Sequence, residues 1–154
     1  MKDLKQTSNA FPVTVVSTAP GIVTLNQSGV GPAVVGMYDQ NGVYKGTNSA
    51  QSPAQKGWIL AIYLTGEGKV TPQPADGAVI TVVNGTTPVQ VFAPTVRIDE
   101  NPSTVIGYGE VSGLVNGVLQ LNAIVPQGVR SGPVSLSVGI GNGATQANVT
   151  VQIQ

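Results

Sequence analysis

Carboxylates are the side chains in this sequence that could carry acid–base chemistry near neutral pH, because the chain contains no histidine and no cysteine. Without them there is no imidazole or thiolate metal ligand, no Ser-His-Asp or Cys-His machinery and no disulfide. General acid–base catalysis would need two converging carboxylates, one with a raised pKa. Most of the acids lie in segments that indicate loops or turns, and these acids are Asp3, Asp39, Glu67, Asp76, Asp99, Glu100 and Glu110. We therefore expect no catalytic residues and no enzyme; the alternative is a hydrolase with two loop acids within about 10 Å of each other.

Two pairs of acids could supply oxygen ligands to a cation. Calcium takes about six to eight oxygens, usually from several carboxylates. Glu67 and Asp76 bracket one long loop, and Asp99 is adjacent to Glu100, so either pair could share an ion with backbone carbonyls. The segment 39–42 opens like a calcium loop, but no acid follows at the required distance, which favours a hairpin turn. We predict no metal and no cofactor, and calcium at either pair remains the alternative.

Few aromatic side chains are available to stack on a sugar ring. Tyr44 lies beside Lys45, and Tyr38 precedes the same predicted turn. Trp58 and Tyr63 are five residues apart, so on a regular strand they face opposite sides and one of them is expected to be buried. We take Tyr44 and Tyr38 as the candidate contacts for a glycan.

The charge content of the chain excludes several classes of partner. Charged residues make up 9% of the sequence, against roughly 25% in an ordinary domain. The seven basic residues do not cluster, so no nucleic-acid footprint is expected. No apolar run is long enough to span a membrane. Solubility that depends on uncharged polar side chains is typical of extracellular modules, so we expect an extracellular or cell-surface location.

The elements that would position these residues are all strands. The apolar residues are largely β-branched, and 20 glycines with 11 prolines interrupt every run before a helix could form. Short strands separated by turn signals suggest a β-sandwich or barrel and favour an antiparallel two-sheet β-sandwich over residues 19–154, preceded by a flexible segment over residues 1–10. We expect the core at 58–64, 119–125, 134–138 and 149–153. The expected strands are 11–18, 22–25, 33–38, 42–44, 57–65, 78–83, 89–92, 95–98, 104–108, 117–125, 133–140 and 144–153.

A series of strand and turn sequences also resembles a known family. The series comprises Phe11–Ile22, Gly57–Gly68, Val70–Gly77, Leu119–Gly128 and Gly132–Gly139. In this order it resembles the C-terminal domain of large secreted acidobacterial proteins of the Solibacter type, over about residues 10–154. The resemblance implies an immunoglobulin-like fold and carries no established activity or catalytic residues. The chain departs from the family at residues 97–104, which lack an expected Gly-Gly turn, and residues 1–9 match nothing.

The segment 11–18 alternates like a strand, with Phe11, Val13 and Val15 on one face. The resemblance implies that it is the last strand of a preceding module. Two alternatives follow: it folds back as the first edge strand of its own domain, or it is donated to the open sheet edge of a neighbour. Donation predicts a non-catalytic structural module whose partners are copies of itself or neighbouring modules, joined into a surface fibre. The alternative function is a carbohydrate-binding module of a secreted protein.

Overall fold

The computed structural model describes residues 9–154, and these residues contain strands and no helix. The predicted flexible segment over residues 1–10 therefore lies outside the described residues, except for its last two. None of the described segments is a helix with the length and apolar character needed to traverse a lipid bilayer. The strands are β1 (Gly21–Ile22), β2 (Gly31–Pro32), β3 (Val35–Tyr38), β4 (Tyr44–Thr47), β5 (Ile59–Thr65), β6 (Val70–Thr71), β7 (Val89–Gln90), β8 (Pro94–Ile98), β9 (Asn101–Glu110), β10 (Leu119–Ile124), β11 (Gly132–Ile140), β12 (Gly143–Ala144) and β13 (Val149–Ile153).

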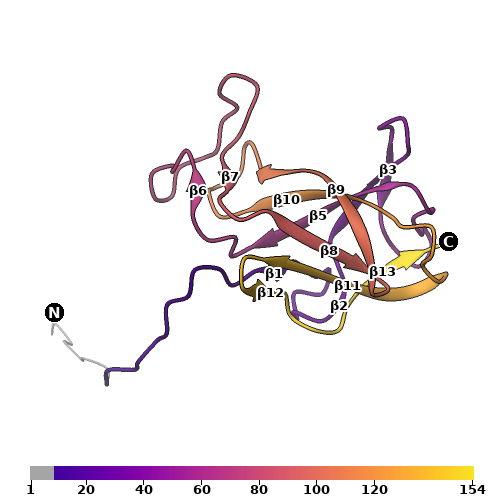
Figure 1. Ribbon diagram of the computed structural model, residues 1–154, viewed down its shortest axis with the longest axis horizontal. Helices are drawn as coiled ribbons and strands as arrows, with labels where there is room; N and C mark the ends of the chain where they lie inside the picture. Colours follow the sequence, from indigo (N-terminus) through magenta and orange to yellow (C-terminus); the bar gives the residue numbers. More distant parts are fainter. Residues whose placement is uncertain (1–8) are drawn as a thin grey trace, which may run out of the picture.

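Eleven of these strands form one curled sheet in the order β2-β13-β11-β8-β9-β10-β5-β3-β4, while β1 pairs with β5 and β12 with β11. Strands β6 and β7 form a separate two-stranded sheet at one end of the molecule (Figure 1). The pairs are antiparallel except for β13 with β2. The prediction of an all-β domain is confirmed, and the expected strand at 57–65 is present as β5.

Strand β9 joins two parts of the curled sheet. Its first residues pair with β8, and the stretch from Thr104 to Glu110 pairs with β10. The β9–β10 register shifts between Asn122 and Ala123, which bends the strand as a β-bulge does. The strands β4-β3-β5-β10 lie on one side of β9 in this curled sheet, and β8-β11-β13 lie on the other.

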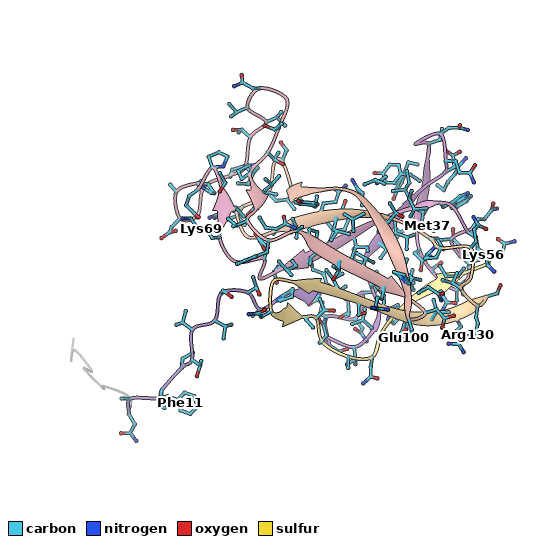
Figure 2. The ribbon with its side chains drawn as sticks, viewed as in Figure 1. Phe11, Met37, Lys56, Lys69, Glu100 and Arg130 are labelled. Carbon is cyan, nitrogen blue, oxygen red and sulfur yellow. The ribbon has the colours of Figure 1, made fainter. Side chains whose placement is uncertain are left out.

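The core lies inside the curled sheet and takes residues from strands on both sides of β9. Alternate residues of β10 are buried, namely Leu119, Leu121 and Ala123, and β13 buries its residues at the same period of two. Side chains from both sides of β9 belong to one buried cluster, which Met37 of β3 joins (Figure 2). Trp58 is partly buried and packs against this cluster. The four predicted core segments therefore supply core residues.

Candidate functional sites

The N-terminal segment projects from the folded body (Figure 1). Residues 9–16 form no strand, so the edge strand expected for residues 11–18 of the chain's own sheet is not present. Phe11 is 85% exposed, Val13 77% and Val15 92%, and Figure 2 shows Phe11 far from the sheet. The alternation predicted from the sequence thus belongs to a segment that, among the described residues, has no sheet to cover it.

The segment meets the body at Thr18. Its hydroxyl is buried and donates to the backbone carbonyl of Ile140 at 2.7 Å. The next residue, Ala19, donates its N–H to the carbonyl of Gly66 at 2.9 Å. A Cβ on Gly66 would lie 2.0 Å from the Ala19 oxygen, so only glycine permits this approach. The free segment therefore ends before Thr18, and the expected strand 11–18 is divided between a free part and an anchored end.

An apolar groove lies in the segment between β6 and β7. It has a volume of about 490 Å³ and is lined by residues 72–88, including Pro72, Pro74, Val79 and Val83. Residues 78–83, expected to be a strand, make isolated bridges instead of a ladder. The two valines are each 62% exposed. Like the N-terminal segment, this stretch has the sequence of a strand without a full set of strand partners.

Two glutamates converge inside the molecule, which the sequence did not lead us to expect. Glu67 follows β5 and is 3% exposed, while Glu110 ends β9 and is 4% exposed. Both oxygens of Glu110 accept from the N–H of Gly117 at 3.0 Å. Burial, and after it hydrogen bonding to the Glu110 carboxyl, raises the pKa of Glu67 to about 7. The pair can share a proton at neutral pH.

Some polar atoms around this pair have no hydrogen-bond partner. Glu67 Oε2 has no hydrogen-bond partner among the described residues, and neither amide atom of the buried Gln90 on β7 has one. The nearby Glu110 carboxyl is one of the causes, after burial, that raise the pKa of Glu67. The arrangement can hold a proton between the two acids.

The pairs proposed for calcium are arranged differently from the expectation. Glu67 is buried whereas Asp76 is exposed, so they do not form one site. The guanidinium of Arg130 binds the Asp99 carboxylate, and the backbone N–H of Arg130 also donates to Asp99 Oδ2 at 2.9 Å. These contacts lower the pKa of Asp99 to about 2. Glu100 accepts from the Ser135 hydroxyl at 3.1 Å. No cluster of three or more acidic side chains that could hold a metal occurs within residues 9–154.

The turn that opens at Asp39 is a hairpin, as the sequence favoured. Asp39 Oδ1 accepts from the N–H groups of Asn41 and Val43, each at 2.9 Å. Its other oxygen forms an ion pair with Lys45 at 2.8 Å. These contacts, with the Lys45 hydrogen bond first, lower the pKa of Asp39. The Asp39 carboxylate therefore uses both of its oxygens in contacts that stabilise the turn.

The candidate glycan contacts Tyr38 and Tyr44 lie side by side on β3 and β4. Their ring centroids are 5.2 Å apart at 56°. They line a hollow of about 380 Å³ together with Tyr63 of β5, whose pKa is raised by partial burial and then by the two neighbouring tyrosines. Trp58 packs on the core side of the same chain segment, in agreement with the opposite faces expected for Trp58 and Tyr63. Tyr63 could have been identified from the sequence as a third residue of this aromatic group, because it lies five residues after Trp58 and so faces the opposite side of the strand.

Compared with protein-family models, curated proteins and solved structures, the chain matches none of them.

Proposed function

We propose that this domain is a non-catalytic structural module of an extracellular fibre or array, and that it joins a second copy of itself through residues 11–16. The exposure of Phe11, Val13 and Val15 is the observation that carries the proposal. A strand-like segment without a sheet partner offers its N–H and C=O groups for pairing with another chain, and such pairing would cover its exposed apolar side chains.

The magnitude of the apolar contribution favours a reversible contact. Burying a large apolar side chain stabilises by about 1.5–3 kcal/mol, so three such side chains contribute roughly 5–9 kcal/mol. Association costs at least about 4 kcal/mol in lost translational and rotational freedom. Main-chain hydrogen bonds from β-augmentation add to the favourable side. We therefore expect assembly that depends strongly on protein concentration.

The groove lined by residues 72–88 is the acceptor that we propose. Its wall at residues 78–83 uses the N–H and C=O of Ile80 to bond with the segment 113–114, which leaves its other side open for a strand. The side chains that border it, Val79 and Val83, are apolar and exposed, which matches Phe11 and Val13 in character. Donor and acceptor are different surfaces, so the contact is heterologous and extends into a fibre unless the copies close on themselves.

The fold and composition support the rest of the proposal. Two groups of strands that share one core, connected through β9, support an immunoglobulin-like sandwich. A charge content of 9% gives little repulsion between copies. Both features are usual in extracellular modules, so we propose a location outside the cell.

Two complementary variants test donation. A donor variant carries Phe11→Ser, Val13→Ser and Val15→Ser, and an acceptor variant carries Val79→Ser and Val83→Ser. We expect the full chain to form larger species as concentration rises in sedimentation velocity, whereas each variant alone stays monomeric. Mixed together, they should give a one-to-one complex that grows no further. The acceptor variant keeps residues 11–16 intact, and the donor variant keeps the groove that receives them.

The matched control is Val16→Ser, an exposed apolar position on the opposite face of the same segment. It should assemble like the full chain. A deletion of residues 1–16, which keeps the Thr18 anchor, should be monomeric with unchanged thermal stability. A full chain that sediments as a monomer at every concentration would refute the proposal. Assembly that persists in the donor variant would also refute it.

A further inference from the structure

A row of tyrosines, amides and small residues crosses the outer face of the curled sheet. The inward positions of β3, β5 and β10 are buried core residues, so their alternate positions lie on the opposite face, where Ala61 of β5 is itself buried and the others are partly exposed. Strand register places Tyr38 opposite Tyr44, Tyr63 opposite Gln120, and Ala61 between Gly36 and Asn122. On the far side, Gln120 and Asn122 lie opposite two glycines of β9. We call this set the tyrosine strip: Gly36, Tyr38, Tyr44, Ala61, Tyr63, Gly107, Gly109, Gln120 and Asn122.

The strip carries two hollows, one on each side of the Tyr63–Gln120 pair. The first, of about 380 Å³, is lined by Gly36 and the three tyrosines. The second, of about 240 Å³, is lined by Gln120 and Asn122. Five adjacent strands at about 4.8 Å spacing make the strip roughly 19 Å long. That length suits an extended chain of several units and is longer than one small molecule requires.

The rings of Tyr44 and Tyr38 lie beside Gly36, at a distance where an added Cβ would make ordinary van der Waals contact with them. A Cβ at this position would lie 3.5 Å from Tyr44 Cε2 and 3.8 Å from Tyr38 Cε2. Tyr44 is nevertheless 55% exposed, so much of its surface is open to a ligand. A ring supported on one side and open on the other is the arrangement that stacking on an apolar face requires.

The polar groups of the strip are uncharged. Gln120 donates from Nε2 to Asn122 Oδ1 at 2.9 Å, which fixes both amides and leaves further donor and acceptor positions on each. Glu110 is the carboxylate among the residues that line the two hollows. It is 4% exposed and accepts from Gly117. A ligand with apolar ring faces, many hydroxyls and no charge matches this surface.

We propose that the tyrosine strip binds a neutral polysaccharide chain, with sugar rings stacked on Tyr44 and Tyr38 and hydroxyls hydrogen-bonded to Gln120 and Asn122. This activity goes beyond the assembly proposal and uses different residues. An assembly module that holds a glycan would attach the array to a cell wall or extracellular matrix.

The test uses neutral hexasaccharides of glucose in β-1,4 and β-1,3 linkage, xylose, mannose and N-acetylglucosamine. Each is titrated into the 15N-labelled deletion of residues 1–16, so that self-association does not interfere. We expect at least one to shift amide signals confined to β3, β4, β5 and β10. Tyr44→Ala and Tyr38→Ala should each weaken that binding by about 2- to 10-fold, since one aromatic contact supplies that much. Gln120→Ala should weaken it as well.

The matched control is Phe92→Ala, an aromatic side chain that is 42% exposed and lies outside the strip. It should bind as the parent does. If none of the hexasaccharides shifts the strip signals, the proposal is refuted. Binding that Tyr44→Ala and Tyr38→Ala leave unchanged would refute it too, because the sugar would then lie elsewhere. Neither result bears on assembly through residues 11–16.

Discussion

Replacing Glu67 by glutamine should remove a pH dependence from the stability of the domain. Burial and the contact with Glu110 raise the pKa of Glu67 from 4.5 to about 7. Between these values the folded protein keeps a proton that the unfolded chain releases. The contribution of Glu67 to stability must therefore fall as pH rises through this window, and this contribution must be level below about 4.5 and above about 7.

The size of the effect follows from the same two values. Each pKa unit corresponds to about 1.4 kcal/mol, so the difference between 4.5 and about 7 costs the folded state about 3 kcal/mol at pH 8. The amide of Glu67→Gln carries no charge and can donate to the Glu110 carboxylate, as the protonated acid does. At pH 8 the variant should therefore be more stable than the parent by up to about 3 kcal/mol, and at pH 4 the two should be nearly equal.

Urea unfolding at intervals from pH 4 to pH 8 measures the free energy of unfolding of the parent and of Glu67→Gln, and the m-value should stay constant across the series. The matched control is Asp76→Asn, which neutralises an exposed acid in the loop that follows Glu67 and should leave the parent's pH profile unchanged. Glu110→Gln should lower the upper end of this pH window, because the neighbouring Glu110 is one of the causes that raise the pKa of Glu67 in the folded protein. A Glu67→Gln variant that keeps the parent's pH slope, or is less stable than the parent at pH 8, would refute the reasoning.

Three further substitutions test the packing. Leu121→Ala empties a fully buried core position and should cost about 2–5 kcal/mol in urea unfolding. Asn48→Ala removes two hydrogen bonds of 2.8 Å to the main chain of β13 and should cost about 1–3 kcal/mol, read as a lower thermal midpoint. Gly66→Ala forces a Cβ onto the Ala19 oxygen and should destabilise more than Gly113→Ala, which has a similar positive φ but open space around it. Equal losses in the two glycine variants would show that the close approach at residue 19 is not what matters.

Period-two patterns made the core predictable. In β10 and β13 every second residue is apolar, and the structure buries those residues. The strand expected at 57–65 is also present, as β5, and it lies between β10 and β3. These features are local in the sequence, so they require no knowledge of which strands pair.

The glutamate pair could not be predicted because it depends on pairing at long range. Glu67 and Glu110 come together because β10 lies between β5 and β9, which brings the loop after β5 near the end of β9. From the sequence, Glu67 was paired with Asp76 in the same loop, and Glu110 was paired with no other acid. Glu110 lies beyond the strand expected at 104–108, so nothing in the sequence indicated that its side chain faces inward.

The turn within residues 97–104 was also not predictable from the sequence, for a different reason. They lack the Gly-Gly turn that the family resemblance implies, yet they form the tight β8–β9 hairpin. Asp99 and Glu100 adopt φ values of 51° and 62° there, which non-glycine residues rarely do. The side chains of Arg97 and Arg130 bind the Glu100 carbonyl and the Asp99 carboxylate, and these contacts stabilise the turn. Asp99 was a candidate calcium ligand because its partner, Arg130, is remote in the sequence.

Assembly and glycan binding would strengthen each other without any contact between their sites. A single strip with two exposed or half-buried rings gives modest affinity, since each aromatic contact contributes only about 0.5–1.5 kcal/mol. Copies joined through residues 11–16 would present many strips to one polysaccharide, and linked sites can exceed single-site affinity by about 10²–10⁴-fold. The full chain should therefore be retained on an insoluble neutral polysaccharide under conditions that wash off the deletion of residues 1–16, although both bind a soluble hexasaccharide equally. Equal retention of the two proteins would show that the strips do not act together.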